Sequence, residues 1–180
     1  LILAGYDVTK EPTDGALRAL LTRADAARRL ECMARTMSWR TEGRLNVVVH
    51  GAHAPTNLEW QRYVTVAVST SARTDTRVVV LSRGGSPDGA QRQTLAAALR
   101  GRPDPVALLT DKVLARAAVA AMRPFNPSMK AFPTTGLKEA CAFLGLTPDE
   151  RERVAKLLVE LEKEIDEATV AEPPGRPESR

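Results

Sequence analysis

The segment Arg83–Gly89, which reads Arg-Gly-Gly-Ser-Pro-Asp-Gly, is the part of this sequence whose composition best suits ligand binding. Glycines leave backbone N–H groups accessible and a following helix N-terminus attracts anions, so the segment could hold a phosphate. It lacks the Lys-Ser/Thr ending of a P-loop, the glycine spacing of a dinucleotide-binding fingerprint and the Gly-x-Ser-x-Gly pattern of a hydrolase. The favoured interpretation is therefore simpler: a turn that caps a helix.

A second polar loop, Thr110–Lys112, follows the next predicted strand. Ligands of open α/β sheets gather at the carboxyl ends of the strands, so we expect both loops to lie at one edge of the sheet. The residues that we expect to contact a partner or ligand there are Arg83, Gly84, Gly85, Ser86, Asp88, Gln91, Arg92, Thr110 and Asp111.

Ser86 precedes Pro87 and is a candidate phosphorylation site. A phosphate beside a helix N-terminus is electrostatically favoured, and Arg83 or Arg92 could pair with it. A Ser-Pro pair in a glycine-rich turn is also common for conformational reasons alone, and this second interpretation is the favoured one.

The remaining candidates for catalysis or metal binding are few. His50 and His53 could offer two metal ligands, but a catalytic zinc needs three, and Cys32 and Cys141 lie far away on predicted helices. No aspartate pair is placed by the sequence as an acid and a base, and no Ser-His-Asp arrangement has independent support. We therefore expect no catalytic residue, no metal, no cofactor and no enzymatic activity.

Composition excludes several other classes of protein. The chain has 180 residues, 43% of them hydrophobic, and a net charge of +4, which suits one globular domain with appendages. Three Phe, two Trp and two Tyr are too few for a base-stacking surface, and the arginines are scattered, so no nucleic-acid partner is expected. No apolar run approaches the ~20 residues of a membrane span, and no secretory signal is evident, so we expect a cytoplasmic protein.

The elements that would position the two loops lie in residues 37–146. A hairpin is predicted over 38–50, and a Thr56-x-x-Glu59 capping box begins a helix that ends near residue 71. Apolar strands at 77–82 and 105–110 then alternate with helices at 90–100 and 111–123, followed by a strand at 129–132 and a helix at 137–144. This alternation predicts a layered α/β domain with a mostly parallel sheet.

The two ends of the chain have different character. Residues 1–36 are an N-terminal extension with a basic amphipathic helix pattern; alternatively, they result from a mis-assigned gene start, with translation beginning at Met33 or Met37. Residues 147–170 are predicted to form an amphipathic helix that starts at a Thr147-x-x-Glu150 capping box, and 171–180 have the composition of a disordered tail.

The apolar residues of the C-terminal helix, which are Val154, Leu158, Leu161, Ile165 and Ala168, follow heptad-like spacing. They could pack against the α/β domain or form a homodimer seam. Residues 37–146 carry a net charge of +7 and residues 147–180 carry −4, so electrostatic attraction favours packing against the chain's own domain.

The order of the predicted elements resembles that of bacterial STAS-like domains, in the stand-alone branch related to anti-sigma-factor antagonists and lipid-binding CRAL-TRIO domains. The motifs that carry the resemblance are Val78–Ser82, Gly84–Asp88, Gln91-Arg92, Val106–Asp111, Phe125-Asn126-Pro127, Lys130-Ala131-Phe132 and Glu139–Leu144.

The resemblance implies a non-enzymatic interaction domain. In anti-sigma-factor antagonists, a partner kinase phosphorylates a serine in a strand-to-helix loop, and this switches partner binding. Ser86 occupies the corresponding loop, although the Asp-Ser pair that precedes a glycine in those proteins is absent here, because Pro87 follows Ser86. We therefore expect a regulatory or protein-interaction domain that docks a protein partner through residues 83–92. The alternative is a domain that binds an anionic or apolar small molecule at the carboxyl ends of the strands.

Overall fold

The computed structural model describes residues 35–71, 75–99, 104–122 and 128–170, so the predictions for the N-terminal extension and the C-terminal tail lie outside the described residues. The elements in chain order are β1 (Met37–Glu42), β2 (Leu45–His50), α2 (Asn57–Ser71), β3 (Arg77–Ser82), α3 (Gly89–Ala98), β4 (Val106–Leu109), α4 (Val113–Met122), β5 (Met129–Phe132), α5 (Leu137–Phe143) and α6 (Pro148–Val170). The layered α/β prediction is confirmed.

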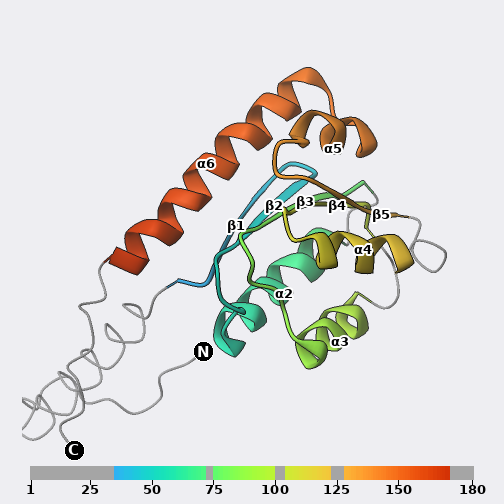
Figure 1. Cartoon of the computed structure of the whole chain (residues 1–180). Coiled ribbons are helices and arrows are strands. Elements are labelled where there is room, and N and C mark those ends of the chain that lie inside the picture. Colours follow the sequence, from blue (N-terminus) through green and yellow to red (C-terminus); the bar gives the residue numbers. More distant parts are fainter. Residues whose placement is uncertain (1–34, 72–74, 100–103, 123–127, 171–180) are drawn as a thin grey trace, which may run out of the picture. The chain divides into compact units, whose positions relative to one another are not determined.

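The five strands lie in the order β1-β2-β3-β4-β5, with β1 antiparallel to β2 and all other neighbours parallel. The helices α2, α3 and α4 all lie on the same side of the sheet (Figure 1), which is the arrangement that right-handed crossovers give when strands are added in one direction. The other side is covered by α5 and α6 (Figure 1). The strand order never reverses, so the sheet lacks the switch-point crevice of doubly wound folds.

Alternate residues of the strands serve two separate cores. Val47 and Val49 of β2 face a large core that includes α5 and α6, whereas Val48 faces a smaller core with Trp60 and Tyr63 of α2. This alternation follows from the two-residue period of a strand. It explains why the apolar run of β2 is buried at every position.

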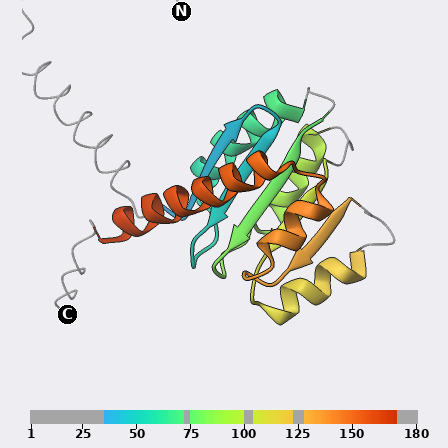
Figure 2. The ribbon, with the colours of Figure 1, turned by 90° about the horizontal axis from the view of Figure 1, so that it is seen from above.

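The C-terminal helix packs on its own domain, as predicted. Val154, Leu158, Leu161 and Ile165 are buried in the large core. Seen from above, α6 lies across β1 and β2, while α5 lies over β4 and β5 (Figure 2). These four side chains would have to leave the sheet to form the alternative homodimer seam.

Ion pairs join the acidic helix to basic residues of the sheet, as the charge distribution predicted. The pairs are Arg40–Glu164, Arg44–Glu150 (2.6 Å), Arg83–Asp166 (2.6 Å) and, with reversed sign, Arg153–Glu42 (2.7 Å). They lie at both ends of α6 and so fix its direction on the sheet.

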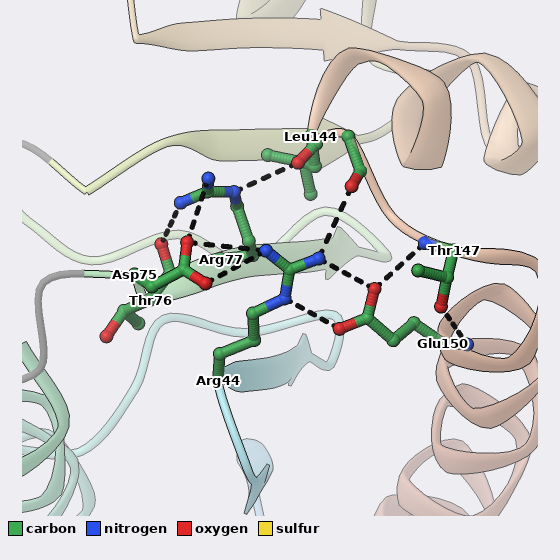
Figure 3. Close-up of polar contacts among 8 residues, drawn as sticks. Arg44, Asp75, Thr76, Arg77, Leu144, Thr147 and Glu150 are labelled. Carbon is green, nitrogen blue, oxygen red and sulfur yellow. Dashed lines mark hydrogen bonds and ion pairs between the residues drawn. The ribbon is translucent and has the colours of Figure 1, made fainter.

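Arg44 and Glu150 form the best-connected of these contacts (Figure 3). Arg44 donates from Nε and Nη2 to the two Glu150 carboxylate oxygens at 2.6 and 2.8 Å, and from Nη1 to Asp75. Glu150 also accepts a hydrogen bond from the Thr147 backbone N–H at 2.8 Å, which completes the predicted capping box. The hydrogen bonds from Arg44 lower the pKa of Glu150 to about 2.

Candidate functional site

The glycine-rich segment after β3 does not form a phosphate cradle. Three consecutive backbone N–H groups already donate to protein oxygens: Arg83 to His50 O (3.0 Å), Gly84 to Ser82 Oγ (3.3 Å) and Gly85 to Gly51 O (2.9 Å). Groups engaged in this way are not available to bind a phosphate, because each N–H has one proton to donate. The interpretation of this segment as a turn that caps a helix is confirmed.

Gly85 holds the segment against the loop that follows β2. A Cβ atom added at Gly85 would lie 2.0 Å from the His53 carbonyl oxygen, which is far inside van der Waals contact. Only glycine therefore allows the two loops to approach this closely. The close contact gives the Arg83 loop a fixed path at the edge of the sheet.

The second half of the predicted docking segment serves the fold. Asp88 is the N-cap of α3 and forms a capping box with Gln91. Gln91 is buried, and its side-chain Nε2 donates to Pro55 O at 2.9 Å. The Gln91 backbone carbonyl oxygen accepts a hydrogen bond from Trp60 Nε1 at 2.8 Å. These contacts fasten α3 to α2. Asp88 and Gln91 are thus engaged on the α2 side of the sheet.

Ser86 and Arg92 are exposed to solvent, as Asp88 is, whereas Gln91 is buried. The Arg92 guanidinium donates to the Pro87 carbonyl oxygen at 2.6 Å, which draws it over the same loop. Ser86 lies two residues before Asp88, the N-cap of α3. Phosphorylation of Ser86 stays a prediction.

A cleft of about 590 Å³ opens at the carboxyl ends of β3 and β4, on the side of the sheet that α5 and α6 cover. One wall is formed by Arg83 and by Asp111 and Lys112, which follow β3 and β4. The opposite wall is α6, with Val159 and Glu162. The lining between them is apolar and comes from Leu81, Leu109, Leu137 and Leu158.

The predicted site residues therefore divide into two groups. Arg83 and Asp111 line the cleft, and Gly84 lies beside it, since a Cβ at Gly84 would be 3.4 Å from Lys112 Cε. Thr110 is fully buried next to them, and its hydroxyl accepts a hydrogen bond from the Lys112 N–H. The other predicted residues do not line the cleft.

Asp111 anchors the wall of the cleft. Its carboxylate accepts hydrogen bonds from the Thr134 N–H at 3.0 Å and from the Thr134 hydroxyl at 2.6 Å, and these bonds lower the pKa of Asp111. The bonds join the loop after β4 to the loop after β5. The sequence predicted that this helix begins at residue 111, but α4 begins at Val113. The bonds to Thr134 hold Asp111 in the loop and explain the difference.

Sequence reasoning missed the parts of the cleft contributed by Lys112 and by α6. Lys112 could have been found, because it lies in the polar loop that contains Asp111. Val159 and Glu162 lie on the helix side that the heptad spacing does not include, and no local signal linked them to the strand ends. Val159 is 67% exposed and lines the cleft.

The histidines and the described cysteine take no part in the cleft. His50 is buried at the end of β2, and burial lowers its pKa to about 4. Cys141 is fully buried, and burial raises the pKa of its thiol. Within the ranges that the structure describes, no group of three or more His, Cys, Asp or Glu side chains is arranged to hold a metal ion.

The fold and the cleft define a singly wound α/β domain with a groove at the carboxyl edge of its parallel strands. No protein-family model matches the chain, and no curated protein or solved structure is significantly similar to it. Among the helices described, none is both long enough and apolar enough to cross a membrane.

Proposed function

We propose that this chain is a non-enzymatic, STAS-like interaction domain that docks a protein partner in the cleft between the strand ends and α6. The STAS resemblance rests on the order of elements in residues 37–146, and the order from the β1-β2 hairpin to α5 is compatible with it. The docking surface proposed here differs from the one predicted from the sequence. It consists of Arg83, Lys112 and the exposed side of α6, and not of the whole of residues 83–92.

The observation that carries the proposal is the composition of the cleft. An apolar lining is flanked by charged side chains from two elements, and it is open to solvent at Val159. Interfaces combine an apolar centre with a polar rim in this way. Two of the groups that could act in catalysis there are bonded within the fold: the Ser82 hydroxyl donates to Gly85 O at 2.8 Å, and Asp111 accepts two bonds from Thr134.

The test compares two substitutions of exposed valines. Val159→Glu places a charge in the cleft, while Val68→Glu makes the same change on α2, where Val68 is 40% exposed and distant from the cleft lining. Proteins captured on the tagged chain from its own cells are quantified for both variants and the wild type. We expect at least one protein to be lost with Val159→Glu and retained with Val68→Glu. Identical capture by all three proteins would refute the proposal.

A second candidate function is the binding of a small anionic or apolar molecule at the same place. The cleft volume lies within the range of about 300–1,000 Å³ that is usual for ligand sites, and two cations line one wall. Native mass spectrometry of the purified chain tests this candidate. A bound mass that is present in the wild type and absent in Val159→Glu would favour it over a protein partner.

A further inference from the structure

Two charged side chains of the cleft are left without a partner by the rest of the described chain. Arg83 pairs with Asp166, and Asp111 is bonded to Thr134. In contrast, the Lys112 ammonium and the Glu162 carboxylate form no ion pair within 4.0 Å and no side-chain hydrogen bond with any described residue. Lys112 and Glu162 stand on opposite walls of the cleft.

The residues around Lys112 and Glu162 give the two walls of the cleft opposite charges. The Lys112 side chain lies over Gly84, next to Arg83, since its Nζ would be 3.9 Å from a Cβ placed at Gly84. The wall at the ends of the strands carries Arg83, Lys112 and Asp111, which gives a net charge of +1, since the hydrogen bonds from the neutral Thr134 leave the Asp111 carboxylate charged. The α6 wall is acidic around Glu162, because the neighbouring Lys163 is paired with Glu167 at 3.6 Å.

The cleft is also elongated. A second hollow of about 600 Å³ shares Arg83, Val159 and Glu162 with it and continues along α6 toward Glu167. The apolar lining belongs to the first hollow, whereas the second is lined by Val159 and by charged side chains. An elongated groove of this kind suits an extended segment of chain better than a compact molecule. Apolar side chains supply most of the affinity of such contacts, while rim charges set the orientation and the association rate.

On the basis of the proposed function, we infer that the docked segment of the partner is a short peptide with an apolar side chain between an acidic and a basic residue. The acidic residue pairs with Lys112 at the strand ends, and the basic residue pairs with Glu162 on α6. A uniformly acidic segment would be repelled by Glu162, and a uniformly basic one by Lys112 and Arg83. The two walls thus select both the composition of the docked peptide and the direction in which it lies in the cleft.

The experiment uses a random 12-residue peptide library displayed on phage, selected on the full chain after depletion on Val159→Glu. We expect enriched peptides to carry a large apolar residue flanked by Asp or Glu on one side and Lys or Arg on the other. A synthetic peptide of the consensus sequence, labelled with fluorescein, then serves as the probe in anisotropy titrations at low salt.

Charge reversal provides the decisive comparison. Lys112→Glu and Glu162→Lys should each weaken binding of the consensus peptide, roughly three- to tenfold for a partly exposed pair. The double variant Lys112→Glu/Glu162→Lys should instead prefer the peptide in which the acidic and basic residues are exchanged. Lys156→Glu, which makes the same charge change on α6 outside both hollows, should leave binding unchanged.

The inference is overturned if the enriched peptides are uncharged or carry one sign of charge, if no peptide depends on Val159, or if the double variant keeps the original preference. These outcomes differ from those expected if the proposed function itself is wrong. If the proposed function is wrong, capture of cellular proteins would also be insensitive to Val159→Glu. If capture depends on Val159 and the peptides lack the charge pattern, only the inference about the partner segment is wrong.

Discussion

Replacing Glu150 with Gln should destabilise the protein at neutral pH by removing the charge that Arg44 binds. Glutamine keeps a carbonyl oxygen that can accept the Thr147 N–H, so the cap of α6 is retained and the change isolates the ion pair. The pair is bidentate, with N–O distances of 2.6 and 2.8 Å, and both side chains are less than one third exposed.

The magnitude follows from proton linkage. A carboxyl whose pKa falls from 4.5 in the unfolded chain to about 2 in the folded one contributes up to about 3 kcal/mol of stability at pH 7. Because the pair is partly open to solvent, we expect a measured loss of about 2 kcal/mol for Glu150→Gln. This corresponds to a roughly 30-fold increase in the unfolded-to-folded ratio.

The sign of the pH dependence is also determined. Since the folded-state pKa is depressed, the contribution is fully present above pH 4.5 and is lost as the pH falls toward 2. The difference in unfolding free energy between wild type and Glu150→Gln should therefore shrink to less than about half by pH 3.

Urea unfolding followed by circular dichroism at pH 7, 5, 4 and 3 measures these differences. The matched control is Glu160→Gln on the same helix, where the carboxylate is 48% exposed and 3.9 Å from Lys156. It should cost less than about 0.5 kcal/mol at every pH. The reasoning is refuted if the two variants are equally stable at pH 7, or if the cost of Glu150→Gln does not change with pH.

Three further predictions concern the fold around the site. Gly85→Ala should lower the free energy of unfolding in urea by about 1–3 kcal/mol, because the new Cβ would lie 2.0 Å from His53 O. Gly89→Ala, where a Cβ meets open space, should be neutral or slightly stabilising in the same measurement. Leu161→Ala, at a fully buried position, should cost about 2–5 kcal/mol and Val159→Ala less than about 0.5 kcal/mol; equal thermal midpoints for the two would contradict the packing of α6. Acidification from pH 6.5 to 4 should destabilise the wild type by up to about 3 kcal/mol through His50, because its folded-state pKa of about 4 lies below the unfolded value and the unfolded chain binds the proton more tightly. His50→Gln should lose this part of the pH dependence. If the unfolding free energy of His50→Gln changed with pH as steeply as that of the wild type, the buried, neutral imidazole would be contradicted.

Local pattern was enough to predict the elements. Apolar runs marked β2, β3 and β4, and the pairs Thr56–Glu59 and Thr147–Glu150 marked the starts of α2 and α6. These features depend on backbone geometry and on contacts between residues close in sequence, which a single sequence expresses directly. The packing of α6 on the sheet was also predictable, because its apolar spacing and its charge both required a complementary surface.

The site was only half predictable. The sequence placed Arg83 and Asp111 at the same edge, because the carboxyl ends of neighbouring parallel strands meet there. It could not show that the amides of the Arg83 loop are engaged by residues 50 and 51, nor that Gln91 is buried against α2. Those outcomes depend on which segments of chain approach each other, and loop composition carries no information about that.

The sequence by itself determined the strands, the helices, the capping boxes and the side of α6 that faces inward. Only the tertiary structure decided that α6 crosses the sheet so that Val159 and Glu162 face Lys112 across an apolar groove. The physical reason is that element formation is governed by the 2.0- and 3.6-residue periods of a single segment. A groove between a helix and strand ends depends on the crossing direction. Here that direction is fixed by contacts between residues far apart in sequence, such as the Arg83–Asp166 ion pair and the hydrogen bond from the Ser38 hydroxyl to Glu164, which span 83 and 126 residues.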